Sequence, residues 1–323
     1  MTSEPEAAGD MLPAEVPSTA TEKPHWFRSI FVGPDGIRAV WRFLLYVVMF
    51  MALFQGIQYV LALYPPIRQI FEEVRGGGTI THAFNFLFES SAILAAYLPA
   101  LLLSRIEKRP FGAYGVPLQG AFGRMFWWGT LWGLIFESVE VCLISAFGGF
   151  SFGGLALSGP EIIKHGLLWA FGFLLVGFFE EFFFRGYSQF TLGSWIGFWP
   201  SAIFISALFG YSHLSNPGEG WAGALSVFAF GLFTCFTLQR TGNLWFAIGF
   251  HAAGDYAETF IYSTPDSGLL AGGHLLNSTF HGPKWLTGGT IGPEGSVFDF
   301  VLMFAAFLVF LWLFPAKKAA TSE

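Results

Sequence analysis

Long apolar runs separated by short polar connections dominate this chain of 323 residues. A helix needs roughly 20 mostly apolar residues to cross the hydrocarbon core of a bilayer. Eight runs approach that length and composition, and they lie near 43–64, 82–104, 125–147, 166–190, 196–213, 221–239, 243–263 and 297–314. This pattern predicts an all-α fold, a polytopic transmembrane helical bundle with about eight transmembrane helices.

The polar segments between the runs suggest how the chain is organised. The first residues are rich in Ala, Pro, Thr and Glu and lack an apolar core, which favours a disordered tail over a cleavable signal peptide. The stretch rich in Gly and Pro after the seventh run is too polar to span, so we interpret it as an ordered or partly re-entrant surface loop. The expected parts are a disordered polar N-terminal tail at 1–36, N-terminal transmembrane helices and loops at 37–160, a central group of helices at 161–263, the Gly/Pro-rich loop at 264–296, and a final transmembrane helix with the C-tail at 297–323.

Composition agrees with lipid as the solvent of this chain. It is 54% hydrophobic and 12% charged, whereas soluble globular domains carry about 25% charged residues. The net charge of −6 argues against a nucleic-acid partner. Cys142 and Cys235 both lie in apolar runs without CxxC spacing, which excludes a disulfide framework or a zinc knuckle.

The distribution of basic residues predicts an orientation, because cytoplasmic loops carry an excess of Lys and Arg. With eight spans, only four basic residues fall on the side away from the termini, namely Arg68, Arg75, Lys164 and Lys284. Eleven fall on the other side, and Arg185 lies within a run. We therefore expect a multi-pass protein of the plasma (inner) membrane with both termini cytoplasmic.

The fourth run contains ionisable residues where lipid is expected. Its segment FFEEFFFRG places Glu180, Glu181 and Arg185 in a helix, and a charge at the bilayer centre costs about 2.5–3.5 kcal/mol on insertion scales. Glu181 and Arg185 are four residues apart, on one helical face, and can pair. Glu180 points about 100° away and is left among phenylalanines. The cluster is either a structural ion pair with a spare carboxylate, or the carboxylate is a general base.

Two further runs contribute polar groups. FGYSH ends the fifth run with Phe209 and His213, and HAAGD places His251 and Asp255 four apart in the seventh. Taken singly, the first histidine suits a membrane interface and the second pair suits polar contacts between helices. In a hairpin of the fourth and fifth helices, Glu180 and His213 lie at the same depth, roughly 20–25 Å from the turn. We therefore expect one shared cavity in which a carboxylate and an imidazole hold a water.

At these residues the sequence resembles the CPBP family of intramembrane proteases, which includes CAAX prenyl endopeptidases and bacteriocin-processing (Abi-like) members. The family pattern is EExxxR, then FxxxH, then HxxxN or HxxxD. Here the matching residues are Glu180, Glu181, Arg185, Phe209, His213, His251 and Asp255. The resemblance covers 180–255 and implies that 161–263 is the catalytic core.

The resemblance also implies roles for these residues. Glu180 and His213 would activate the attacking water, and His251 and Asp255 would stabilise the oxyanion of the tetrahedral intermediate. The supporting residues would be Glu181, Arg185 and Phe209. The CAAX-processing members carry Asn where this chain has Asp255, and an ionised carboxylate cannot donate a hydrogen bond. Asp255 would then act when protonated, or by orienting His251 toward the oxyanion.

Family members have been described as metalloproteases and as glutamic proteases. The chain has no HExxH, which would place two histidine ligands on one helical turn. We favour a glutamate mechanism without a cofactor. The alternative is a divalent metal such as zinc held by Glu180, His213 and His251, a His2Glu set.

The predicted function is hydrolysis of a peptide bond by an intramembrane endopeptidase. Its partners would be the lipid bilayer and a peptide or protein substrate, membrane-embedded or prenylated, and no nucleic acid. The competing interpretations are a proton-coupled transporter, since Glu89, Glu137, Glu140 and Glu258 also fall in or beside apolar runs, and a non-enzymatic membrane scaffold or immunity protein. Transporters usually show internal repeats, and none is visible in this sequence.

Overall fold

The structure, a computed structural model, describes residues 30–33, 36–77 and 79–315. The chain divides into two units, Met1–Arg38 and Ala39–Glu323. In the first unit, strands β1 (Val32–Gly33) and β2 (Gly36–Ile37) form an antiparallel pair. Most of the tail predicted to be disordered at 1–36 lies outside the described residues.

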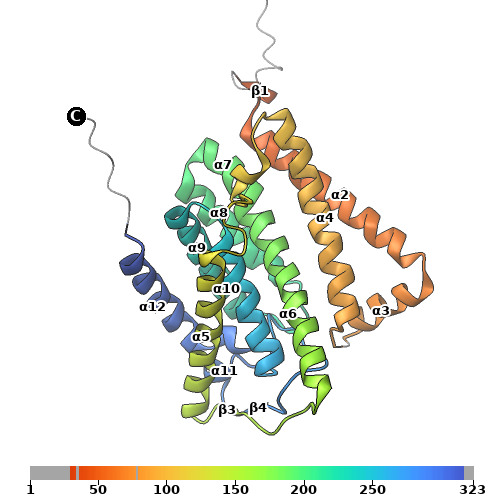
Figure 1. The fold of residues 1–323 in the computed structure, drawn as a ribbon, viewed down its shortest axis with the longest axis vertical. Coiled ribbons are helices and arrows are strands. Elements are labelled where there is room, and N and C mark those ends of the chain that lie inside the picture. Colours follow the sequence, from red (N-terminus) through yellow and green to blue (C-terminus); the bar gives the residue numbers. More distant parts are fainter. Residues whose placement is uncertain (1–29, 34–35, 78, 316–323) are drawn as a thin grey trace, which may run out of the picture. The chain divides into compact units, whose positions relative to one another are not determined.

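The second unit is a bundle of helices, and this confirms the predicted polytopic helical fold (Figure 1). Each predicted run coincides with a helix or with consecutive helical segments. Five of these are long and apolar enough to cross a membrane: α2 (Ala39–Ala62), α4 (His82–Ile106), α5 (Arg124–Ala146), the continuous stretch Pro160–Ile196, and α9 (Trp221–Thr241). The other three are shorter: α8 (Phe198–His213), α10 (Trp245–Tyr256) with the π-helical segment η3 (Ala257–Ile261), and α12 (Val297–Leu313).

The long fourth span has three parts: α6 (Pro160–Glu180), the π-helical segment η2 (Glu181–Ser188) and α7 (Gln189–Ile196). It continues six residues beyond the predicted end at 190. A single residue, Gly197, joins it to α8 with φ of 86°, a left-handed conformation that glycine adopts without steric cost. The hairpin expected from the sequence is therefore present, with a tighter turn.

Two described α-helices lie wholly outside the predicted runs, and one of them has only four residues. Between the first two spans lies α3 (Pro65–Arg75), which starts with proline in its first turn, where a missing N–H costs nothing. Arg68 and Glu72 lie one turn apart on its exposed surface, with their charged atoms 3.7 Å apart. Because α3 contains several charged residues, a search for apolar runs does not detect it.

The Gly/Pro-rich segment 264–296 is irregular but tied down by short pairings. Strand β4 (Thr279–Phe280) pairs with β3 (Phe150–Ser151), which follows α5. Two short helical elements also belong to this segment: α11 (Lys284–Thr287) and the 3-10 turn η4 (Pro293–Gly295). A further 3-10 turn, η1 (Phe111–Tyr114), follows α4. The backbone N–H of Gly268 donates to Ile291 O at 2.8 Å, so the two ends of the segment lie side by side.

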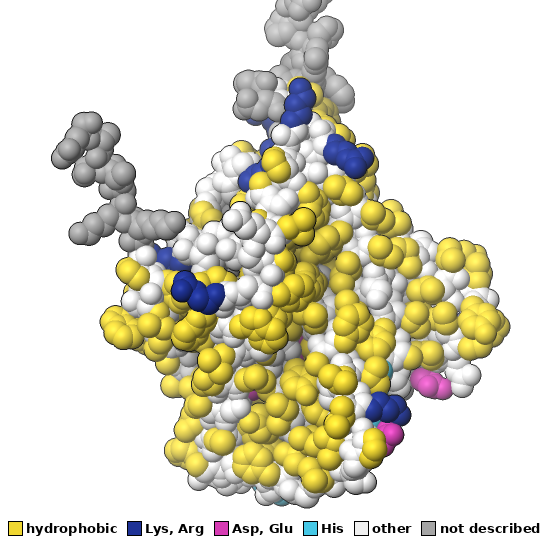
Figure 2. Space-filling view, in the orientation of Figure 1, with side chains coloured by type: hydrophobic (Ala, Val, Ile, Leu, Met, Phe, Trp, Pro, Cys, Tyr) yellow, Lys and Arg dark blue, Asp and Glu magenta, His cyan; other side chains and the backbone are white. Residues whose placement is uncertain are grey.

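Large apolar side chains cover much of the surface, and several charged side chains lie inside. Leu167 on α6 is 67% exposed, whereas Glu140, Glu181 and Arg185 are fully buried. Figure 2 shows mainly hydrophobic side chains on the visible face, with very few acidic ones. Such a distribution suits lipid as the solvent, and this chain is an integral membrane protein.

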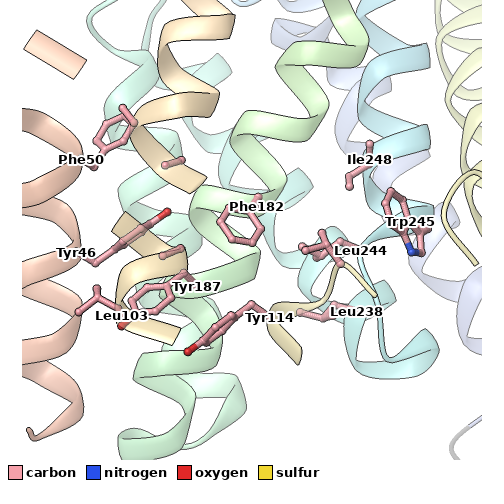
Figure 3. Close-up of a cluster of buried hydrophobic side chains, with 14 of the residues drawn as sticks. Tyr46, Phe50, Leu103, Tyr114, Phe182, Tyr187, Leu238, Leu244, Trp245 and Ile248 are labelled. Atoms are coloured by element: carbon pink, nitrogen blue, oxygen red, sulfur yellow. The ribbon is translucent and has the colours of Figure 1, made fainter. Parts of the chain in front are cut away.

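An aromatic cluster holds the fourth span against α2 and α4. Tyr46 of α2 packs on Phe183 and Tyr187 of η2, with ring centroids 5.5 and 4.4 Å apart (Figure 3). Beside it, the buried carboxylate of Glu107 accepts hydrogen bonds from the hydroxyls of Tyr114 and Tyr187. These contacts fix the segment that directly follows Glu180.

Helix α10 lies between α5 and α6 (Figure 1) and packs on α5 through glycine. A Cβ atom at Gly129 would lie 2.0 Å from Phe246 O, and one at Gly133 would lie 2.3 Å from Phe250 O. This Gly-xxx-Gly spacing lets two backbones approach closely, as in many membrane helix pairs. The helix that carries His251 is thus held at backbone contact distance.

We expect Gly133→Ala to destabilise the protein by about 1–3 kcal/mol, because overpacking forces the two backbones apart. Gly56→Ala on α2 is the matched control, since a Cβ atom there meets nothing within 4 Å. Thermal melts of both variants in detergent check this. Equal melting temperatures for the two variants would contradict the glycine contact.

Candidate active site

A cavity of about 870 Å³ opens within the bundle. Most helices of the bundle contribute to its walls, and so do the π-helical segments η2 and η3 and the 264–296 segment. The four residues predicted to be catalytic all line it: Glu180, His213, His251 and Asp255. All four therefore face one cavity. The distances within the described residues join Glu180, His251 and Asp255, and none joins His213 to Glu180.

His251 lies at the centre of these residues. Its Nδ1 is 2.9 Å from Glu181 Oε1, and its Nε2 is 3.5 Å from Glu180 Oε2 and 3.6 Å from Asp255 Oδ2. A carboxylate can only accept, so Nδ1 carries a proton that it donates to Glu181. This bond fixes the ring and directs Nε2 toward Glu180 and Asp255.

The two adjacent glutamates have different surroundings. Arg185 Nη1 is 3.4 Å from Glu181 Oε1, and both side chains have 0% exposure. The side chain of Glu180 is 18% exposed and lines the cavity. The predicted Glu181–Arg185 pair is present, while Glu180 is the carboxylate accessible to a water and a substrate.

Packing on two sides positions the Arg185 guanidinium. Its Cζ lies 4.0 Å from the ring centroid of Phe209, a favourable cation–π distance. On α9, Gly231 makes room for it, since a Cβ atom there would lie 2.7 Å from Arg185 Nη2. Phe209, predicted as a supporting residue, thus contacts the cation that neutralises Glu181.

A π-helical segment begins where the two glutamates meet. Segment η2 starts at Glu181, and Gly186 within it has non-helical dihedral angles of φ −79° and ψ −109°. Segment η3 likewise follows α10 directly. Such segments are rare and often mark functional sites, and no pattern in the sequence indicated them.

His213 is oriented by the last turn of α8. Its Nδ1 is 2.9 Å from the carbonyl oxygen of Phe209, so Nδ1 is the donor. In the neutral ring this leaves Nε2 as a proton acceptor. The rings of Phe209 and His213 lie 4.7 Å apart, and those of Phe209 and His251 lie 6.3 Å apart. Phe209 therefore packs against both histidines.

Besides Glu180 and Asp255, acidic residues without a predicted site role line the cavity. Eight carboxylate side chains line it: Glu89, Glu137, Glu180, Asp255, Glu258, Asp266, Glu294 and Asp299. Glu89 and Glu137 stood out as carboxylates within apolar runs. Asp266 and Glu294 lie in the polar 264–296 segment, where acidic residues are ordinary, so the sequence contained no signal for them. Burial raises the pKa of Asp266 to about 6.

Within the described residues, one group of three side chains has ligand atoms close enough together for a metal ion. It consists of Glu258, Asp266 and Glu294, with one atom from each lying within 4.8 Å of the others. The alternative of zinc on Glu180, His213 and His251 stays a prediction.

Comparison with known proteins agrees with the motifs. Residues 163–257 match the family model described as type II CAAX prenyl endopeptidase Rce1-like. The match contains every motif residue and confirms the resemblance to CPBP proteases, which supports an intramembrane endopeptidase acting on a protein or peptide at a membrane. No curated protein and no solved structure shows a significant match to the chain.

Proposed function

We propose that this protein hydrolyses peptide bonds inside the membrane with a water activated by Glu180 and His213. The observation that carries the proposal is the placement of Glu180, His213, His251 and Asp255 around one cavity, in a segment that matches a protease family. Three helices supply these side chains, and the packing of apolar helices does not by itself require polar residues to face one cavity.

In the first step a water loses a proton to Glu180, and its oxygen attacks the carbonyl carbon of the scissile bond. Glu180 suits this role because it faces the cavity. Within the described residues, its one ion-pair contact is with His251. The Nε2 of His213 accepts a hydrogen bond from the same water and orients it. When the C–N bond breaks, Glu180 returns the proton to the leaving amine.

The tetrahedral intermediate carries a negative oxygen that needs a donor. His251 protonated on both nitrogens would keep Nδ1 on Glu181 and present Nε2–H to that oxygen. Asp255 Oδ2, 3.6 Å from Nε2, would orient the ring so that this N–H points toward the oxyanion. This assigns Asp255 the orienting role and avoids asking an ionised carboxylate to donate.

The cavity walls favour a lipid-modified substrate. Helices α2, α4 and α6 contribute aromatic side chains to the lining: Phe43, Phe50, Phe54, Phe84, Phe88 and Phe179. An isoprenoid chain would bury apolar surface there, worth about 0.8 kcal/mol per CH₂. We propose a prenylated peptide that places its scissile bond near Glu180.

The experiment is cleavage of matched peptides by the protein reconstituted in liposomes. We expect a farnesylated CAAX peptide to be cut and the same peptide without the lipid to be cut far more slowly, because the aromatic wall then stays unfilled. Mass spectrometry identifies the products. Equal rates would contradict the lipid requirement, and folded protein that cuts neither peptide nor a bacteriocin leader would favour a scaffold or a transporter.

A separate test concerns the metal alternative. We expect 1,10-phenanthroline, which removes zinc, to leave the cleavage rate unchanged within about twofold, because Glu180 itself accepts the proton. The measurement is the initial rate with and without the chelator, and a non-chelating phenanthroline isomer is the control. Loss of activity with the chelator and its return with added zinc would instead support a metal on Glu180, His213 and His251.

A further inference from the structure

A second acidic group lies on the cavity wall, at the junction between α10 and the 264–296 segment. Glu258 belongs to η3, Asp266 follows it, and Glu294 belongs to η4. One carboxylate oxygen from each lies within 4.8 Å of the others. Three carboxylates at this separation repel one another strongly unless protons or a cation intervene.

The surroundings of this group contain unpartnered oxygens. Glu258 is 2% exposed, and its Oε1 has no hydrogen-bond partner among the described residues. Helix α5 packs against η3 and contributes Glu137 and Glu140. Glu140 is fully buried with neither oxygen partnered, and Glu137 is 7% exposed with Oε2 unpartnered in the described structure. Buried ionised carboxylates without partners are costly, and a bound cation would offset that cost.

The described cavity lining supplies no fixed positive charge to compensate. It includes the eight carboxylates named above but no Lys or Arg, and Arg185 is already engaged by Glu181. Among the lining histidines, His251 is already in contact with Glu180, Glu181 and Asp255. The charge on Glu258 and its neighbours thus has no Lys or Arg counter-ion in the described lining.

Neighbouring hydroxyls orient two of the three carboxylates. Thr259 Oγ1 donates to Asp266 Oδ2 at 3.1 Å, and Ser267 Oγ donates to Glu294 Oε2 at 2.9 Å. Such outer hydrogen bonds are typical around metal ligands, because they hold the carboxylates in position.

We propose that Glu258, Asp266 and Glu294 bind a hard divalent cation of the calcium type. Carboxylate and carbonyl oxygens are the ligands that Ca²⁺ prefers, at about 2.3–2.6 Å, so oxygens on opposite sides of the ion are about 4.6–5.2 Å apart. Three oxygens that lie within 4.8 Å of one another can all contact one such ion. Bound there, the cation ties the 264–296 segment to the end of the helical stretch that carries His251 and Asp255.

The test is titration of CaCl₂, and separately MgCl₂, into chelator-stripped protein in detergent by isothermal calorimetry. We expect saturable binding to the wild type and a rise in its melting temperature with added ion. Asp266→Asn should weaken binding about tenfold or more. Glu73→Gln, on the exposed surface of α3, is the matched control and should bind as the wild type does.

Melting temperatures measured with and without the ion show whether Asp266 acts as a metal ligand or only supports the fold. Without the ion, Asp266→Asn should melt at the same or a higher temperature than the wild type, because it removes one repelling charge. With the ion, the order should reverse. Glu294→Gln provides the same comparison if Asp266→Asn does not fold.

Saturable binding of either ion that these variants weaken supports the proposal. No saturable binding up to about 10 mM, ten times the range of weak extracellular calcium modules, overturns it, as does equal binding by the variants. The result does not depend on peptide cleavage, so it stands or fails separately from the protease activity.

Discussion

Glu180→Gln is expected to abolish turnover while leaving the fold intact. The amide is nearly isosteric with the carboxylate but cannot take a proton from water, and loss of a general base typically costs about 10²–10⁴-fold in rate. The side chain is 18% exposed, and its closest charged partner is His251 Nε2 at 3.5 Å. Because the side chain is partly exposed and faces the cavity, the substitution strands no fully buried charge, and the melting temperature should stay close to that of the wild type.

The measurement combines cleavage of the farnesylated peptide with a thermal melt of the same preparation. Binding of the uncleaved peptide should persist, because its lipid and backbone contacts do not involve the proton. Near-wild-type cleavage by Glu180→Gln would show that another group is the base.

Glu181→Gln should have the larger effect on stability, although the chemical change is identical. Glu181 and Arg185 are both fully buried, with a closest approach of 3.4 Å. Breaking such a pair leaves a guanidinium without its counter-charge and costs about 3–5 kcal/mol. The same substitution weakens the hydrogen bond that holds His251 Nδ1 at 2.9 Å. We expect lower expression, a lower melting temperature and loss of cleavage together.

A double variant separates stability from activity. Glu181→Gln with Arg185→Met removes the stranded charge, and replacing a buried ion pair by groups of similar volume is often neutral. The melting temperature should largely recover, whereas cleavage should stay low because His251 lacks its charged partner. A folded Glu181→Gln that is inactive beside an active Glu180→Gln would mean that the base is the other glutamate.

The sequence alone determined the bundle and the motif helices. In lipid, backbone groups must be satisfied within helices, so apolar length was enough to place helices at all eight runs. Spacing of four residues put Glu181 beside Arg185 and His251 beside Asp255, since these contacts lie within one turn of one helix. Local geometry decides such pairs, and both are present in the structure.

Only the tertiary structure decided the contacts between helices and loops. The bond from His251 to Glu181 joins residues 70 positions apart, and it depends on the glycine contact of α5 with α10 and on the π-helical turn after Glu180. Asp266 and Glu294 belong to a polar segment, and only its folding against η3 brings them to Glu258. Periodicity records which face of a helix is apolar, but the depth, rotation and separation of two helices come from side-chain packing that no local pattern contains.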